Sequence, residues 1–259
     1  MLGERTAFPY IFYNTMNRFA INLIIVLLSC LLVGCKKDVY DIDMIYIAGG
    51  TYMMGCDDET ADPDEQPVHS VTVKDFYIGK YEITQEQWKT VMRHDPAYHR
   101  ALKYPVEDVS WDDCQKFIQK LNSITGKNYR LPTEEEWEYV ASISYKNIKK
   151  EDLTSYAWCR GSYGERTRKN ITSQKVGSLK PDIWGIYDII GNVNEWCSNS
   201  YDSLSYQNGF SQESDEKVFK GGCFANEENY LRPTNRNHID RHTRHYTLGL
   251  RLAMDANIQ

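Results

Sequence analysis

The spacing of hydrophobic residues divides the chain into two parts, with the change close to residue 145. In the first part, residues 44–55 and 68–81 alternate apolar and polar positions and are rich in β-branched and aromatic residues, a pattern typical of strands. The first run predicts a hairpin that turns at Gly49 and Gly50, and the second predicts a pair of strands.

Three helix starts lie between these strands and residue 145, and each carries the signature of a capping box. A Ser or Thr side chain accepts a hydrogen bond from a first-turn N–H, and the residue three positions later bonds back. The three pairs are Thr84 with Gln87, Ser110 with Asp113, and Thr133 with Glu136. Apolar residues at helical spacing follow each pair, so we expect three amphipathic helices.

Three glutamates open the third of these helices. Glu134, Glu135 and Glu136 fall in its first turn, where negative charge faces the positive end of the helix dipole. We interpret the triplet as structural, with a catalytic carboxylate as the alternative. Beyond residue 145 glycine, aromatic and polar residues dominate, with short strands expected at 217–220 and 249–253. The pattern predicts an α+β chain with an irregular second half.

The N-terminal region has the pattern of a bacterial lipoprotein signal. Residues 19–34 are nearly all apolar, Arg18 precedes them, and residues 32–35 read Leu-Val-Gly-Cys, which matches a lipobox. We expect a signal peptide over 1–35, with Met16 as an alternative start, acylation of Cys35, and a polar tether over 36–43. The alternative is a plain membrane anchor. Lys36 favours the outer membrane, by analogy with known sorting rules.

Composition excludes several functions. The chain has 259 residues and a net charge of −6 without a long basic stripe, so we expect no nucleic-acid partner. Removing residues 1–35 leaves an odd number of cysteines, so at least one thiol stays unpaired within the chain. These are Cys56, Cys114, Cys159, Cys197 and Cys223. No C-x-x-C pair occurs, which removes support for a zinc ribbon or a thioredoxin-type site.

Residues 184–196 combine glycines, apolar residues and oxygen donors. Asp188 and Glu195 flank a bend at Gly191, so two carboxylates and the carbonyls between them can converge. Ca²⁺ prefers such oxygen ligands in irregular geometry. The alternative is a buried turn whose carboxylates accept backbone N–H groups.

Several motifs together resemble the formylglycine-generating enzyme, or sulfatase-modifying factor, family. Residues 130–137 read Arg-Leu-Pro-Thr-Glu-Glu-Glu-Trp. Other matching stretches occur in the same order as in the family, at 47–55, 76–84, 105–111, 185–196 and 248–253. The resemblance covers about residues 42–254, and we place the domain at 44–255. It implies one domain related to C-type lectins, with few short helices and short antiparallel strands.

The resemblance also implies a metal site and its ligands. The family binds structural Ca²⁺ at residues 184–196, with side-chain oxygens from Asp188 and Glu195. Gly191 and Val193 correspond to the positions that supply backbone carbonyls.

The segment that carries catalysis in the family departs from its pattern. Family enzymes hold Cu(I) between two thiolates, and soft sulfur ligands suit that ion. The two cysteine positions hold Asn226 and Leu231 here, so we expect no copper and no oxidase activity. Cys223 replaces the serine of the motif and, with Cys197, forms a candidate disulfide. A formylglycine-generating oxidase, or another metal-dependent oxidoreductase, remains the alternative.

The C-terminal segment is dense in Asn, His, Arg and Tyr, which suits adaptable polar recognition of a protein or a glycan. Its candidate ligand-binding residues are Asn226, Asn235, Asn237, His238, His242, His245 and Tyr246. The histidines have helical spacing, so a helix would group them as ligands of Zn, Cu or Fe. We therefore expect a non-catalytic, Ca²⁺-stabilised scaffold, lipid-anchored in the cell envelope. The further alternative is a component of a secretion or gliding complex.

Overall fold

The computed structural model describes residues 39–163, 171–209 and 212–256. The expected signal peptide over 1–35, including the candidate lipid attachment site Cys35, lies outside the described residues. Within the ranges given, no helix is long and apolar enough to cross a membrane.

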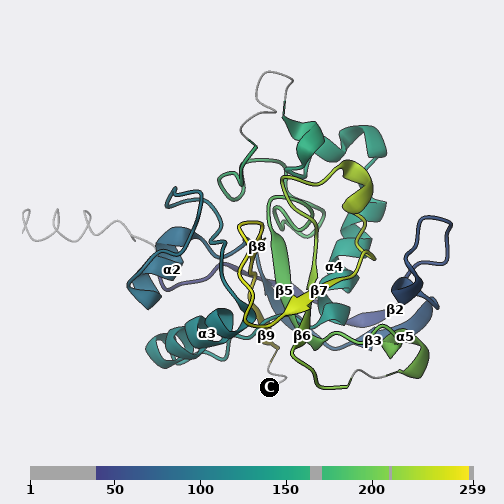
Figure 1. The fold of residues 1–259 in the computed structure, drawn as a ribbon, viewed down its shortest axis with the longest axis horizontal. Helices are drawn as coiled ribbons and strands as arrows, with labels where there is room; N and C mark the ends of the chain where they lie inside the picture. Colours follow the sequence, from purple (N-terminus) through teal and green to yellow (C-terminus); the bar gives the residue numbers. More distant parts are fainter. Residues whose placement is uncertain (1–38, 164–170, 210–211, 257–259) are drawn as a thin grey trace, which may run out of the picture. The chain divides into compact units, whose positions relative to one another are not determined.

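The three expected helices are confirmed. They are α2 (Gln85–Met92), α3 (Trp111–Thr125) and α4 (Glu134–Lys146). Thr84, Ser110 and Thr133 each cap a helix through the complete reciprocal pair of hydrogen bonds. In Figure 1, α2 and α3 lie on one side of the central strands and α4 on the other.

The first four strands form one long, bent hairpin. They are β1 (Met44–Ile47), β2 (Gly50–Met54), β3 (His69–Val73) and β4 (Phe76–Gly79). The strand β1 pairs antiparallel with β4, and β2 pairs antiparallel with β3. One register continues through both pairs, since Met44 lies opposite Gly79 and Gly50 lies opposite Val73.

The predicted hairpin within 44–55 is therefore wrong. The two strands predicted within 68–81 are present as β3 and β4, but they pair with β2 and β1 and not with each other. Gly49 does not turn the chain back. Its N–H bonds the Asp75 carboxylate at 2.8 Å, and a Cβ on it would lie 2.3 Å from the carbonyl oxygen of Val73. Glycine at 49 thus allows the connection between β1 and β2 to pass close to the connection between β3 and β4, where the hairpin bends.

The remaining strands build the central sheet and complete a smaller one. The central sheet has the order β7 (Asn237–Asp240), β6 (Glu216–Lys220), β5 (Asn194–Ser200), β8 (Leu248–Gly249). Only the pair of β5 with β8 is parallel within it. The last strand, β9 (Ala253–Asp255), pairs with β4. The strand expected at 217–220 is confirmed, whereas the one expected at 249–253 is split between two sheets.

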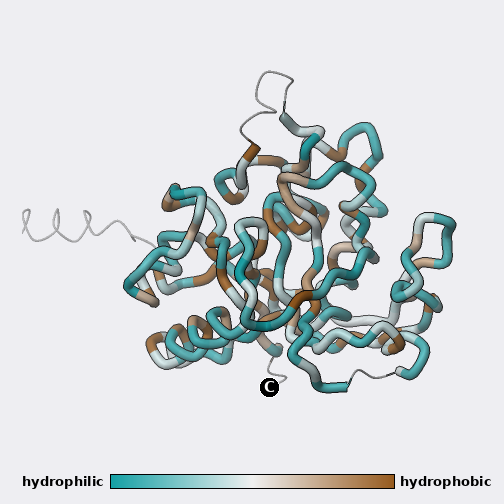
Figure 2. The backbone as a smooth tube through the Cα atoms, in the orientation of Figure 1, coloured by the Kyte–Doolittle hydropathy of each residue, from teal (hydrophilic) through white to brown (hydrophobic). Residues whose placement is uncertain are grey.

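Short helical turns interrupt the loops. One, η1 (Pro63–Glu65), lies between β2 and β3, and four lie in the irregular second half: η2 (Lys150–Ser155), η3 (Arg160–Ser162), α5 (Ser205–Asn208) and η4 (Glu228–Tyr230). Apolar residues form two main buried clusters. One contains Trp137 of α4, and the other stacks Trp88 on Phe117 with ring centroids 4.8 Å apart. Figure 2 shows hydrophobic and hydrophilic positions alternating along α3, as expected for a helix with one buried face.

Candidate functional site

The stretch 184–196 forms a tight turn that leads directly into β5, whose first residues are 194–196. Asp188 and Asn192 have left-handed backbone angles, with φ of 53° and 56°, and Gly191 has φ of 83°. Such angles are uncommon outside glycine, and Asp and Asn tolerate them best. The turn is buried: Asp188 is 3% exposed and Glu195 is 1% exposed.

Glu195 is fully engaged within the protein. Arg251 donates to both of its carboxylate oxygens at 2.8–3.0 Å, and Trp137 donates its indole N–H to Oε2 at 2.8 Å. Arg251 also donates to the carbonyls of Gly79 and Tyr187. This ion pair therefore joins the turn to β4 and to the C-terminal segment.

Two further carboxylates surround this pair. Glu82 accepts from the Asn192 side chain at 2.7 Å and from the Val193 N–H at 3.3 Å. Burial, together with Asp188 and Glu195, raises the pKa of Glu82 well above its usual range. Burial also raises the pKa of Asp188, to about 6. We call Glu82, Asp188, Glu195 and Arg251 the acid-rich cluster, because three carboxylates share one guanidinium.

The acid-rich cluster partly fits the Ca²⁺ ion that the family resemblance implies. Asp188 Oδ2 accepts from the Gly177 N–H at 2.7 Å, but Oδ1 is buried without a hydrogen-bond partner. Burying a polar atom without a partner costs free energy, and a bound cation would remove that cost. No three His, Cys, Asp or Glu side chains within the described ranges are grouped so that they could hold a metal by themselves. A Ca²⁺ ion here would therefore need backbone carbonyls.

The segment after β6 contains Asn226 and Leu231, the positions that the family resemblance assigns to the catalytic cysteines. Asn226 Oδ1 accepts from the Cys223 N–H at 2.8 Å and from its thiol at 3.1 Å, which closes a local turn. Leu231 is 0% exposed and packs in the main apolar core. One position therefore carries a structural amide and the other a buried alkyl group, and neither provides a thiolate.

The candidate disulfide between Cys197 and Cys223 is wrong. Both cysteines are buried and free, as are the other three described cysteines. Cys197 lies in β5 and belongs to the main core, whereas Cys223 packs with Tyr163 and Phe224 in a separate cluster. Burial raises the pKa of both thiols, so they stay protonated near neutral pH.

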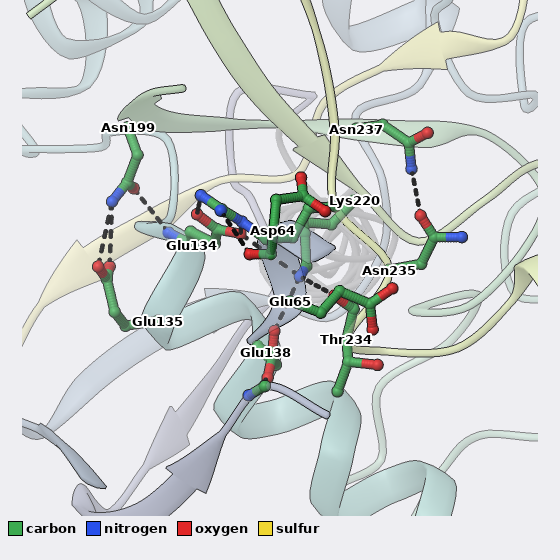
Figure 3. Close-up of polar contacts among 12 residues, drawn as sticks. Asp64, Glu65, Glu134, Glu135, Glu138, Asn199, Lys220, Thr234, Asn235 and Asn237 are labelled. Carbon is green, nitrogen blue, oxygen red and sulfur yellow. Dashed lines mark hydrogen bonds and ion pairs between the residues drawn. The ribbon is translucent and has the colours of Figure 1, made fainter. Parts of the chain in front are cut away.

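A second group of buried charges lies beside α4. Lys220 Nζ is 2.8 Å from Glu138 and 3.5 Å from Glu134, and Arg236 bonds both oxygens of Glu134. We call these four residues the paired cluster, because two carboxylates face two cations. Figure 3 shows Lys220 between Glu138 and Thr234, whose carbonyl accepts from Nζ at 3.3 Å.

The interpretation of the glutamate triplet as structural agrees with these contacts. Glu134 belongs to the paired cluster, and Glu136 completes the helix cap and bonds Arg130 at 2.7 Å. Glu135 accepts from Asn199 at 3.2 Å. Sequence reasoning did not find Lys220 or Arg236, since no local pattern marks a lysine or arginine as buried.

The candidate ligand-binding residues fall into separate places. Asn226 and Asn235 serve the turn structure, since Asn235 is buried and accepts from Asn237 at 3.0 Å. His238 stacks on Tyr201, with ring centroids 3.6 Å apart, and bonds Glu216 at 2.9 Å. His242 bonds Asp112 at the start of α3 at 2.7 Å.

The grouping of three histidines as metal ligands is wrong. His238 lies in β7, and the chain turns after Asp240, so no helix aligns the three rings. His245 instead bonds the hydroxyl of Thr247 at 2.7 Å. The three side chains therefore have three unrelated partners.

The last two candidates belong to an aromatic surface that the sequence did not reveal. The rings of Tyr98, His99, Phe224, His245 and Tyr246 contact one another, with centroids 4.5–6.2 Å apart. Tyr98 is 73% exposed and Tyr246 is 42% exposed. We call these five residues the aromatic platform.

A buried carboxylate holds one edge of the aromatic platform. Glu107 accepts from the backbone N–H groups of Tyr98 and His99 at 3.1 and 2.6 Å. Burial raises the pKa of Glu107 to about 7, against these two bonds, which lower it. Residues 98 and 245 come from distant parts of the sequence, so only the fold brings them together.

Comparison with known proteins now places the chain. It belongs to the family defined by the sulfatase-modifying factor enzyme 1-like domain, whose sequence model matches residues 35–256. PvdO from Pseudomonas aeruginosa has a similar structure, with a TM-score of 0.72 over 84% of this chain and 95% of that one. That similarity, at 24% identity, shows the fold: short mostly antiparallel strands, few helices and little regular secondary structure, as expected.

Relatives in the family carry different names. The chain is 29% identical over 204 residues to chaperone protein LppX of Paenibacillus barcinonensis, covering 60% of this chain and 70% of that protein. It is 23% identical to the inactive C-alpha-formylglycine-generating enzyme 2 of Bos taurus, covering 71% of this chain and 76% of that protein. It spans only 38% of the length of three chlamydial serine/threonine-protein kinases, to which it is 26% identical.

Proposed function

We propose that this protein is a non-catalytic member of the family that binds a protein or a glycan at the cell envelope. The observation that carries the proposal is the chemistry at the two former cysteine positions. Leu231 is wholly buried, and Asn226 uses its side-chain oxygen to hold Cys223. Alkyl groups and carboxamides do not ligate Cu(I) as thiolates do.

A direct assay tests the absence of oxidase activity. We expect no aldehyde when the purified protein is incubated with Cu(I), O₂ and a Cys-x-Pro-x-Arg peptide, measured by mass spectrometry. Conversion of the peptide cysteine to an aldehyde would overturn the proposal and favour an oxidase.

The aromatic platform supports the binding role. Tyrosine rings offer large, rigid contact areas at a small entropic cost, and histidines add polar contacts. Tyr98 and Tyr246 expose their rings together, 5.9 Å apart, over a base fixed by Phe224 and Glu107. Stacking on a sugar ring or packing against a protein side chain are the two uses this surface suits.

The binding role is tested with a glycan array and a pull-down of surface proteins, repeated with EDTA. Where a ligand is found, Tyr98→Ala should weaken binding about tenfold, because exposed aromatic anchors dominate such interfaces. Tyr230→Ala is the matched control, since Tyr230 is 53% exposed on η4. Equal loss in both variants would sink the assignment of the platform, and a stable set of co-purified membrane proteins would favour a complex component.

Calcium and the lipid anchor complete the proposal. Asp188 and Glu195, with carbonyls of Gly191 and Val193, would hold the Ca²⁺ ion, which would supply positive charge to brace the turn. Because Glu195 already accepts from Arg251 and Trp137, Asp188 with its unpartnered oxygen is the residue that depends most on the ion.

Acylation at Cys35 would attach the protein to the membrane, and more than one acyl chain would make that attachment stable. A Cys35→Ala protein that still labels with palmitate would contradict the anchor.

A further inference from the structure

The strand β3 has one unused edge. It pairs with β2 in a two-stranded sheet, and within the described ranges no other strand joins its second edge. Every other residue of such a strand points its N–H and C=O away from its partner. Natural edges are usually blunted with lysine, proline or a bulge. The sequence of β3, His-Ser-Val-Thr-Val, contains neither lysine nor proline and favours strand pairing.

Two cavities follow this edge. One, of about 690 Å³, is lined by Val71 to Asp75 together with the first turn of α4. The other, of about 510 Å³, is lined by His69 to Val71 and by residues 198–200 of β5. Val71 and Glu135 line both cavities. Consecutive residues of a strand point to opposite faces, so a cavity lined by all of them runs along the edge.

The charge of this groove identifies its occupant. Among its carboxylates, Glu134 pairs with Arg236, Glu136 and Asp255 with Arg130, and Glu213 with Lys217. Two remain without a cation within the described part of the chain. The Glu135 carboxylate accepts from the Asn199 side chain, as Figure 3 shows, and the Asp75 carboxylate accepts from the Tyr46 hydroxyl and the Gly49 N–H. Lys74 is the one lysine in the lining of either cavity.

We propose that an extended, lysine- or arginine-bearing peptide segment of a partner protein adds to the free edge of β3. Its backbone pairs with β3, and a basic side chain meets the carboxylate of Glu135. Strand addition uses main-chain hydrogen bonds for affinity and alternate side chains for selectivity. This site is separate from the aromatic platform and does not depend on the function proposed for it.

The experiment measures binding of a fluorescent peptide to the full chain by anisotropy. The probe has about seven alternating valine and lysine residues, enough to span the five-residue strand β3. Two N-methylated versions block alternate amides. One should bind about tenfold more weakly and the other almost normally, because a strand that adds to an edge donates through every second N–H only. A peptide with glutamate in place of lysine should bind more weakly than the lysine peptide.

Protein variants locate the site. Glu135→Gln should weaken the lysine peptide about three- to fivefold, since it removes one partly screened charge pair. Glu86→Gln, which removes an exposed carboxylate on α2, is the matched control and should leave binding unchanged. The proposal is overturned by no binding of the lysine peptide, by equal effects of the two N-methylation patterns, or by equal effects of the two variants.

Discussion

The paired cluster and the acid-rich cluster both bury carboxylates beside cations, but in different proportions. The paired cluster has two cations for two carboxylates, and the acid-rich cluster has one cation for three. In the paired cluster, Lys220 and Arg236 neutralise Glu134 and Glu138. Burial alone would raise the pKa of Glu134, yet the two cations hold it below its usual range. In the acid-rich cluster, Arg251 is the one cation facing three carboxylates, and the pKa values of Glu82 and Asp188 are both raised.

This difference separates a structural role from a binding role. Buried charges are tolerated when they are paired and hydrogen-bonded, and they are costly otherwise. The paired cluster meets that condition with the protein's own side chains and needs no ligand. The acid-rich cluster does not, and the deficit of positive charge is what a divalent ion would supply. The two clusters therefore make opposite predictions for mutation, pH and Ca²⁺.

The largest expected effect is the loss of a cation from the paired cluster. Lys220→Met leaves Glu134 and Glu138 buried with Arg236 alone, so we expect a loss of about 3–5 kcal/mol in the free energy of unfolding. Urea denaturation measures it. Lys120→Met, at an exposed position of α3, should change stability by less than about 0.5 kcal/mol. A deficit for Lys220→Met as small as that of the control would show that the cluster contributes no more than a surface charge.

The stability deficit of Lys220→Met, which is its loss in the free energy of unfolding, should depend on pH because the pKa of Glu134 is lowered in the wild type. A carboxyl whose folded pKa is lowered stabilises the protein above its unfolded pKa, and this contribution is lost as pH falls through the folded value. In Lys220→Met the pKa of Glu134 rises, so the native variant takes up protons at higher pH. The deficit should be greatest near neutral pH and shrink as pH falls towards 4. A deficit that is constant with pH would contradict the electrostatic explanation.

Calcium should act on the acid-rich cluster with a smaller effect. At a hundred times its dissociation constant, Ca²⁺ should stabilise the wild type by about 2.7 kcal/mol. Asp188→Asn should abolish this gain yet be at least as stable as the wild type in EDTA, because asparagine tolerates the φ of 53° and removes an unpaired charge. Thermal unfolding with Ca²⁺, Mg²⁺ or EDTA measures both. The exposed control Asp152→Asn should keep the calcium response; a wild type that Ca²⁺ does not stabilise would end the proposal.

The helices were predictable from sequence because their signals are local. Thr84, Ser110 and Thr133 each sit three residues from their capping partners, so a short window contains the whole interaction. The strand pairing was not predictable in the same way. Residues 44–47 show β-alternation, but nothing near them indicates that their partner is at 76–79, across the loop between β2 and β3. Local patterns specify an element, whereas pairing depends on the distant chain.

The sites divide along the same line. Asp188 and Glu195 lie close in sequence, whereas Arg251, which neutralises Glu195, is 56 positions from it. The partners within the paired cluster are separated further, with Glu138 and Lys220 82 positions apart. The pairing of Cys197 with Cys223 failed because sequence proximity to a glycine-rich turn says nothing of the side chains' directions. Leu231 illustrates the reverse, since its lack of sulfur is evident in sequence alone.

The smallest expected effect concerns the C-terminal basic segment, which resembles neither cluster. Arg244 bonds Asp113 at 2.7 Å at the start of α3, but its side chain is 58% exposed. Solvent screens such a pair, so Arg244→Ala should cost less than about 1 kcal/mol of unfolding free energy. Arg236→Ala, in the same segment but with its side chain fully buried, is the comparison and should cost several times more. Chemical denaturation of the two variants measures the ratio, and similar losses would mean that burial does not set the energetic difference between these ion pairs.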